Sequence, residues 1–173
     1  MLLLRATSLD DTHAVAAAIA GLARTGDIIV LAGEMGAGKT AFAQGFGRAL
    51  GITEPITSPT FTLVHSYPFG RRGTLHHADL YRLDSTADVA DLALDELAEF
   101  GGIVLVEWGD VVGGLGEHLE VRLSFDTNHD ADPDPDLGDD DLPDAREIEI
   151  GAVGSRWAGR WQRLTDALAG FRE

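Results

Sequence analysis

The 173-residue sequence contains no cysteine, and none of its apolar runs approaches the roughly 18 residues that a membrane-spanning helix requires. The absence of cysteine excludes a disulfide framework and a thiolate metal site. The apolar run Met1–Leu4 is too short for the core of a signal peptide and is followed by Arg5. An apolar fraction of 45% with mean hydropathy near zero is typical of a soluble globular protein. We therefore expect a single cytoplasmic domain over residues 1–173, without membrane contact.

Basic residues are scarce: the sequence has 13 of them and 29 acidic residues, which gives a formal net charge of −16. Nine aspartates lie in the segment 126–144, which also holds three of the six prolines and no Lys or Arg. Such a composition cannot bury enough apolar surface to order itself, so it predicts a flexible surface loop. A Ca²⁺ site is the alternative, although an EF-hand loop needs a central glycine and a glutamate at its twelfth position. The acidic composition argues against direct binding of nucleic acid, because such binding depends on basic patches.

Lysine is nearly absent as well: Lys39 is the one lysine in the sequence, and the other twelve basic residues are arginines. Lys39 lies in the segment Gly-Glu-Met-Gly-Ala-Gly-Lys-Thr at 33–40. This segment fits G-x-x-x-x-G-K-[ST], the P-loop, in which backbone N–H groups cradle phosphates and the hydroxyl binds Mg²⁺. An ammonium is a compact point charge, whereas a guanidinium is a wide planar fork that a loop around phosphates cannot accommodate. The pattern predicts binding of a nucleoside triphosphate. A glycine-rich turn that binds nothing is the alternative.

The flanking residues have the order that a P-loop requires, with a buried strand before it and a helix after it. Residues Asp27–Ala32 are rich in β-branched side chains, as a buried parallel strand should be. Residues Thr40–Leu50 place Phe42 and Phe46 at helical spacing, and Gly51 predicts the end of that helix.

The rest of the chain predicts further strands and helices around this unit. Strands are expected at 2–7, 61–69, 74–80, 103–106, 119–125 and 146–152, with a hairpin turn at 70–73. Helices are expected after Asp10 or Asp11 as the cap, in the acidic stretch 89–100, and over 157–171. Short buried strands mixed with hairpins predict an α/β, three-layer fold similar to P-loop NTPases, with a mixed central sheet and antiparallel edge strands.

Two carboxylates end predicted strands. Glu107 follows the apolar run Val104–Val106 and has the form of a Walker-B acid, which would place Mg²⁺ opposite Thr40. These two residues would suffice as protein ligands for Mg²⁺, and a solvated glutamate at a strand end is the alternative. Asp79 lies where ligands of open α/β sheets gather. It would orient or deprotonate the attacking water or hold the hydration shell of the metal, unless it forms a salt bridge to Arg82.

Other candidates rest on position alone. Thr60, after a Ser-Pro pair, is placed like a switch threonine that senses the γ-phosphate, and an ordinary turn residue is the alternative. Trp108 is a candidate for stacking on the adenine or covering the site, and a core position is the alternative. The histidines lack metal-ligand spacing, because the adjacent pair at 76–77 would point to opposite faces of a strand. Neither a serine nucleophile motif nor an Asn-Lys-x-Asp guanine motif occurs.

Four motifs follow one another along residues 10–125. They are the P-loop at 33–40, Ile-Thr-Ser-Pro-Thr-Phe-Thr-Leu-Val at 56–64, His-Ala-Asp-Leu-Tyr-Arg-Leu at 77–83, and Val-Glu-Trp at 106–108. In this order they resemble the TsaE (YjeE) family of small bacterial P-loop ATPases required for threonylcarbamoyladenosine modification of tRNA. Two features depart from the family pattern: Ala78 replaces a bulkier residue, and the acidic segment resembles a lineage-specific insertion.

The resemblance implies a role for each matching residue. Thr40 and Glu107 would serve Mg²⁺, and Asp79 would be needed for turnover. The residues implied to contact ATP are Thr12, Gly33, Gly36, Ala37, Gly38, Lys39, Thr40, Ala41 and Trp108. With Thr60 as the γ-phosphate sensor proposed above, the expected catalytic residues are Lys39, Thr60, Asp79 and Glu107.

The resemblance also implies partners. ATP hydrolysis would be coupled to cycling of the proteins TsaD and TsaB, which carry out carbamoyl transfer to adenosine 37 of tRNA. We expect an ATPase that is monomeric and weak alone, is stimulated by these partners, and meets tRNA only through their complex. The alternatives are a small-molecule kinase, which would usually carry a lid with several arginines, and a nucleotide-gated binding module that hydrolyses nothing useful. Outside the last helix only Arg71 and Arg72 cluster.

Overall fold

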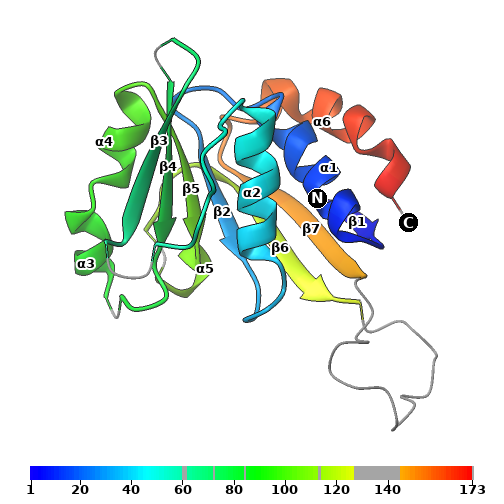
Figure 1. The fold of residues 1–173 in the computed structure, drawn as a ribbon, viewed down its shortest axis with the longest axis horizontal. Helices are drawn as coiled ribbons and strands as arrows, with labels where there is room; N and C mark the ends of the chain where they lie inside the picture. The colour runs from blue at the N-terminus through cyan, green and yellow to red at the C-terminus, as the bar shows by residue number, and fades with distance from the viewer. Residues whose placement is uncertain (60–61, 72, 84, 113, 127–144, 173) are drawn as a thin grey trace, which may run out of the picture.

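A mixed sheet forms the middle of the molecule (Figure 1), and in the part of the chain that the structure describes it has seven strands in the order β1-β7-β6-β2-β5-β4-β3. The computed structural model describes residues 1–173 apart from 60–61, 72, 84, 113, 127–144 and 173. The strands are β1 (Leu2–Ala6), β2 (Ile28–Ala32), β3 (Val64–Phe69), β4 (Gly73–Asp79), β5 (Gly102–Glu107), β6 (His118–Phe125) and β7 (Arg146–Val153). The predicted acidic loop, apart from Asp126, lies outside the described residues, as does Thr60.

The middle of the sheet is parallel, and both of its edges are antiparallel. β2 pairs in parallel with β5 and β6, and β4 pairs in parallel with β5. β1 pairs antiparallel with β7, β7 with β6, and β3 with β4. Every residue of β2 and β5 is buried, because both faces of these strands are covered. The predicted mixed sheet with antiparallel edge strands is confirmed.

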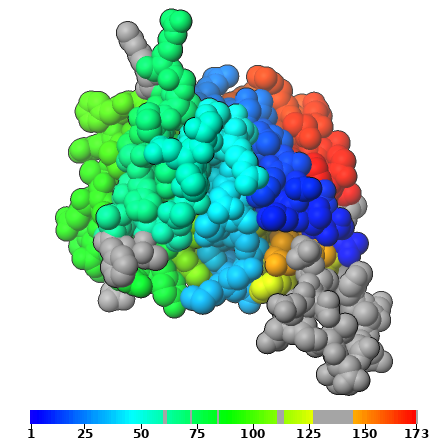
Figure 2. All heavy atoms as spheres, viewed as in Figure 1, coloured from blue at the N-terminus to red at the C-terminus, as the bar shows by residue number. Residues whose placement is uncertain are grey.

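Helices cover both faces of the sheet. On one face lie the helices α1 (Leu9–Ala20), α2 (Lys39–Ala49) and α6 (Trp161–Ala167), together with the 3₁₀ turns η2 (Ala158–Arg160) and η3 (Ala169–Phe171). On the other face lie the helices α3 (Thr86–Asp91), α4 (Leu94–Glu99) and α5 (Gly109–Val112). Figure 2 shows α2 at the centre of the first face, α1 beside it, and the C-terminal residues next to α1. The three-layer α/β fold is therefore confirmed. Within the described ranges, no helix has the length and apolar character needed to cross a membrane.

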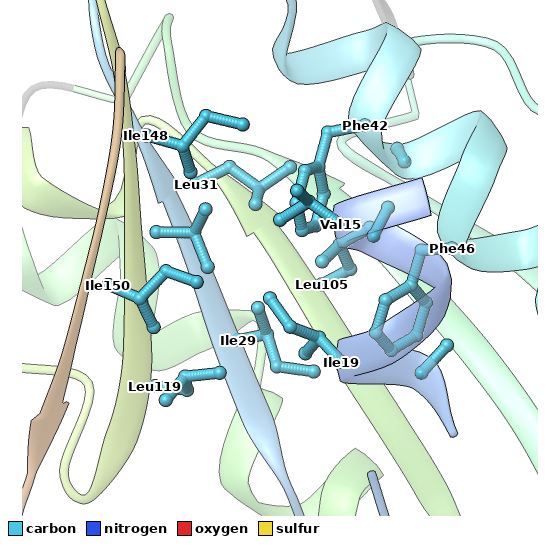
Figure 3. Close-up of a cluster of buried hydrophobic side chains, with 14 of the residues drawn as sticks. Val15, Ile19, Ile29, Leu31, Phe42, Phe46, Leu105, Leu119, Ile148 and Ile150 are labelled. Carbon is cyan, nitrogen blue, oxygen red and sulfur yellow. The ribbon is translucent and has the colours of Figure 1, made fainter. Parts of the chain in front are cut away.

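Side chains from α1 and α2 meet the central strands in a shared core (Figure 3). α1 contributes Val15 and Ile19, and α2 contributes Phe42 and Phe46. The labelled strand residues beneath them are Ile29, Leu31, Leu105, Leu119, Ile148 and Ile150. Both phenylalanines are fully buried, and burial of such a side chain is worth roughly 1.5–3 kcal/mol. They therefore hold α2 against the sheet directly after the loop at 33–38.

Two expectations about helices in the first hundred residues are wrong. The cap of α1 is Ser8, whose Oγ accepts from the amide of Asp11, and Asp11 itself accepts from the amide and hydroxyl of Thr7. The acidic stretch forms two short helices instead of one, because Ala93 between them adopts a left-handed conformation with φ of 49°. After this break Phe100 is 87% exposed. The strand expected at 61–69 begins at Val64.

The C-terminal segment is tied to the beginning of β2 by a buried ion pair. Arg160 donates from Nη1 to Asp27 Oδ2 at 2.6 Å and from Nη2 to Oδ1 at 2.9 Å. Its guanidinium also lies 4.1 Å from the ring centroid of Trp157. Side chains three residues apart eclipse one another in a 3₁₀ turn, which brings Trp157 and Arg160 together. The prediction of a single helix over 157–171 is wrong, because this segment forms the 3₁₀ turn η2, the helix α6 and the 3₁₀ turn η3.

Candidate functional site

The loop at 33–38 joins β2 to α2 at the carboxyl end of the parallel strands (Figure 1). Gly33 has a φ of 130°, and a Cβ at this position would lie 2.1 Å from the carbonyl oxygen of Leu123 on β6, so only glycine fits. Gly38, with a φ of 105°, precedes α2 without a side-chain cap among the described residues. The N–H groups of the first turn of α2 therefore remain available to an anion. The loop has the shape that a phosphate cradle requires.

An open pocket of about 300 Å³ lies directly over this loop. Its walls come from the loop, the start of α2, the segment before β3, and the ends of β4 and β5. The lining residues are Met35, Gly36, Gly38, Lys39, Thr40, Ser58, Asp79, Tyr81, Glu107 and Trp108. The structure thus gathers Lys39, Thr40, Asp79, Glu107 and Trp108, all predicted from the sequence, around one pocket.

Lys39 is held inside the loop. Its Nζ donates to the carbonyl oxygens of Gly33 and Glu34, at 2.7 Å each, and lies 3.8 Å from the ring centroid of Trp108. The residue is only 5% exposed. Burial lowers the pKa of the Lys39 ammonium from its usual 10.5, although nearby carboxylates, above all Glu107, oppose this shift. A buried cation of this kind gains from any anion that enters the pocket.

Glu107 is buried at the end of β5, and two side chains contact its carboxylate. Thr40 Oγ1 donates to its Oε1 at 3.2 Å, and His77 Nε2 lies 2.9 Å from the same oxygen. His77 was missed by sequence reasoning, which considered the 76–77 pair only for metal binding and rejected it. Alternation along β4 and β5 places His77, which is fully buried, on the same face of the sheet as Glu107, and its register partner Leu105 lies two residues before Glu107. The oxygens of Thr40 and Glu107 could hold Mg²⁺, because this ion takes few protein ligands and completes its octahedron with phosphate oxygens and water.

Asp79 ends β4 beside Glu107, its register partner on β5. Its Oδ2 accepts from Ser58 Oγ at 2.8 Å, and its Oδ1 accepts from the amide of Tyr81 at 2.9 Å. The carboxylate is half-buried and faces the pocket. Two donors therefore fix its orientation while its remaining lone pairs stay available to water. Ser58 and Tyr81 were not identified from the sequence in this role, although they lie in the motifs at 56–64 and 77–83.

Trp108 occupies a conformation that is rare for a bulky residue. Its φ is 64°, and its amide donates to the carbonyl of Leu31 at 3.0 Å. Its ring lies 5.0 Å from that of Tyr81, at an interplanar angle of 49°. This backbone turn directs the indole over Lys39 at the edge of the pocket, instead of fully into the core. Stacking on the adenine stays a prediction.

The remaining candidates that the structure describes are not among the residues that line the pocket. Thr12 is buried on α1, its hydroxyl 3.4 Å from the carbonyl oxygen of Ser8, and it is not part of the pocket lining. Ala37 is fully buried within the loop, and Ala41 is half-buried in the first turn of α2. Gly33 carries the carbonyl that accepts from Lys39. Contact of these residues with a nucleotide stays a prediction, and Thr60 lies outside the described residues.

Comparison with known proteins identifies one family. The model of the family "Threonylcarbamoyl adenosine biosynthesis protein TsaE" matches residues 6–133. A protein of Bacillus subtilis named tRNA threonylcarbamoyladenosine biosynthesis protein TsaE is 37% identical over 155 residues, which cover 88% of this chain and 87% of the relative. A protein of the same name from Streptomyces coelicolor is 37% identical over 142 residues, or 81% of this chain and 89% of the relative.

The fold has a solved counterpart. The crystal structure of Bacillus subtilis YdiB superposes with a TM-score of 0.70 and 31% sequence identity, covering 95% of this chain and 94% of the other. The similarity therefore extends well beyond the phosphate-binding loop and includes the β6–β7 side of the sheet.

Proposed function

Because the chain belongs to the TsaE family, which acts in the biosynthesis of threonylcarbamoyladenosine in tRNA, we propose that it is a Mg²⁺-dependent ATPase of this pathway. The reaction is hydrolysis of ATP to ADP and phosphate, weak in the isolated chain and stimulated by TsaB and TsaD. Hydrolysis drives cycling of the TsaB–TsaD complex during modification of adenosine 37. This chain does not itself transfer the carbamoyl group, and it reaches tRNA only through the complex.

The observation that carries the proposal is the meeting of Lys39, Asp79 and Glu107 around one pocket above the loop. Lys39 and the loop amides would neutralise charge on the β- and γ-phosphates, which is where phosphoryl transfer needs stabilisation. Thr40 and Glu107 would hold Mg²⁺, which when bound supplies further positive charge to the phosphate oxygens. The side chains of Lys39 and Thr40 are held by hydrogen bonds to the loop carbonyl of Gly33 and to the carboxylate of Glu107.

Asp79 is assigned to the attacking water. Ser58 and the Tyr81 amide hold its two oxygens in a fixed orientation, half-buried at the pocket wall. An oriented carboxylate can accept a hydrogen bond from water and so align it for in-line attack. Loss of this carboxylate would reduce turnover more than nucleotide binding, since its role is confined to the water.

Dependence on partners fits the exposed mouth of the pocket. Met35 is 67% exposed and Tyr81 56% exposed, and both line the pocket. An isolated chain would leave the bound phosphates open to bulk water, which weakens electrostatic stabilisation. A partner surface over these two side chains would close the pocket and raise the hydrolysis rate.

Depletion of the protein, followed by mass spectrometry of tRNA nucleosides, tests this proposal. We expect threonylcarbamoyladenosine to disappear, to return with the wild-type gene, and to stay absent with Asp79→Asn. In parallel, phosphate release by the purified chain should rise on addition of TsaB and TsaD. Normal levels of the modified nucleoside after depletion would contradict the pathway. Full rescue by an Asp79→Asn chain that binds but does not hydrolyse ATP would contradict the role of hydrolysis.

A further inference from the structure

The phosphate-binding loop is supported from behind by the end of β6 and the start of β7. Figure 1 shows these strand ends at the same edge of the sheet as the loop between β2 and α2. Arg146, the first residue of β7, donates from Nε to the carbonyl oxygen of Ala37 at 3.2 Å. Arg146 lies outside residues 6–133, the part of the chain that the family model matches. A residue from the C-terminal region therefore bonds directly to the backbone of the loop.

A ring links this arginine to the rest of the loop. The guanidinium carbon of Arg146 lies 4.5 Å from the ring centroid of Phe125, its register partner on β6. The far edge of that ring lies 3.7 Å from the place a Cβ of Gly36 would occupy. Arg146 is thus stacked on a side chain that itself packs on the loop, so its position relative to Ala37 is restrained on two sides.

The hydrogen bond to Ala37 determines the direction of the next N–H group. In a planar trans peptide the C=O and the N–H point in opposite directions. The carbonyl of Ala37 is directed toward Arg146, so the N–H of Gly38 in the same peptide points the other way. Gly38 lines the pocket, whereas Ala37 is fully buried beneath it. The Gly38 N–H therefore points to the side on which phosphates would bind.

This peptide needs an external restraint. Gly38 has a φ of 105°, and glycine adopts positive and negative φ about equally readily, so the peptide before it can flip at low cost. A guanidinium is charged at all ordinary pH values, and charge-assisted hydrogen bonds are stronger than neutral ones. A permanent cationic donor on the carbonyl favours the orientation in which the N–H faces the pocket.

We propose that Arg146 is a positioning residue, which holds the Ala37–Gly38 peptide so that the Gly38 N–H is aimed at the phosphates of the nucleotide. Its benefit to ligand binding rests on the ATP binding proposed above. Arg146 acts through the backbone and does not itself reach the phosphates. The orientation of the peptide, in contrast, is a property of the free protein and can be measured without any nucleotide.

The test compares Arg146→Gln with Arg122→Gln. Arg122 is a matched control, because it lies on the same strand pair but bonds to Asp110 and Glu120. In protein labelled with ¹⁵N-glycine, we expect Arg146→Gln to shift the Gly38 amide resonance and Arg122→Gln to leave it in place. ATP affinity, measured by calorimetry, should fall about tenfold in Arg146→Gln, as expected for loss of a hydrogen bond to a charged group.

The outcomes separate this proposal from the proposed function. An unmoved Gly38 resonance in folded Arg146→Gln overturns the positioning role, whatever happens to ATP binding. Equal loss of affinity in both variants also overturns it, because net charge would then be the cause. If the resonance shifts but the wild-type chain binds no ATP, the proposed function fails and the peptide orientation stands. Should Arg146→Gln not fold, Phe125→Leu removes the stacked ring alone, and it must shift the same resonance by a smaller amount.

Discussion

Thr40 and Glu107 stand 67 residues apart in the sequence, yet the Thr40 hydroxyl donates to the Glu107 carboxylate at 3.2 Å. Thr40 lies in the first turn of α2, and Glu107 ends β5, the parallel neighbour of β2. The parallel pairing of β2 and β5 therefore brings the two oxygens proposed to hold Mg²⁺ within hydrogen-bond distance of each other.

Glu107→Gln should reduce Mg²⁺-dependent ATP hydrolysis by about a hundredfold, because the amide keeps the shape but removes the charge from the metal site. Phosphate release in the presence of TsaB and TsaD measures this effect. ATP binding in EDTA should change little and serves as the control for folding. Hydrolysis at the wild-type rate would show that Glu107 does not hold the metal.

Lys39→Arg should weaken ATP binding by about a hundredfold although the charge is kept, because two carbonyls at 2.7 Å suit a compact ammonium and not a planar fork. Calorimetric titration of ATP into the variant measures the loss, and Lys39→Ala should bind no better. A thermal melt verifies that both variants fold. Wild-type affinity in Lys39→Arg would mean that only the charge at position 39 matters.

Asp11→Asn should destabilise the protein at neutral pH and have no effect in acid. Hydrogen bonds from the side chain and amide of Thr7 lower the pKa of Asp11 from its usual 3.8. Because the folded state favours the ionised form, this stability is present above the ordinary pKa and is lost as the pH falls through the lowered one. We expect the Tm to fall by about 1–2 °C at pH 7, since the group is solvent-accessible.

The matched control for this change is Asp10→Asn, which removes an equal charge from an exposed neighbour in the same helical turn. Thermal melts of both variants and the wild type, taken from pH 7 down to pH 2, give the comparison. A Tm difference between wild type and Asp11→Asn that persists at the lowest pH would rule out the carboxylate as its source.

Arg160→Met should lower the free energy of unfolding by about 3–5 kcal/mol, because it leaves the buried carboxylate of Asp27 without its cation. Urea denaturation measures the change. Adding Asp27→Asn to the same chain should recover part of the loss, since the unpaired charge is then gone. A double variant that is less stable than the sum of the two single changes would contradict this account.

Sequence reasoning was sufficient where the signal is local or follows from topology. β2 and β5 are buried on both faces, so each is a continuous apolar run in the sequence. Asp79 and Glu107 end neighbouring parallel strands, and such ends meet at one edge of a sheet, so their proximity could be predicted. The pairing of these elements with a P-loop was enough to locate the pocket.

The missed contacts depend on strand register and on backbone strain. His77 reaches Glu107, and Arg146 reaches Ala37, only because particular strands are neighbours in a particular register. Ala93 and Trp108 adopt positive φ without being glycine, so no residue type marks the break between α3 and α4 or the turn after β5. These features become visible only when distant segments are placed together.

The ion pair between Asp27 and Arg160 joins positions 133 residues apart, one inside and one outside the region that the family model matches. If only one of the two residues is replaced, the other charged side chain stays buried without its partner, which destabilises the protein. Lineages that replace one of these residues should therefore replace the other, and the two columns of an alignment should covary. An alignment confined to residues 6–133 would include Asp27 but not Arg160, so it could not reveal this covariation.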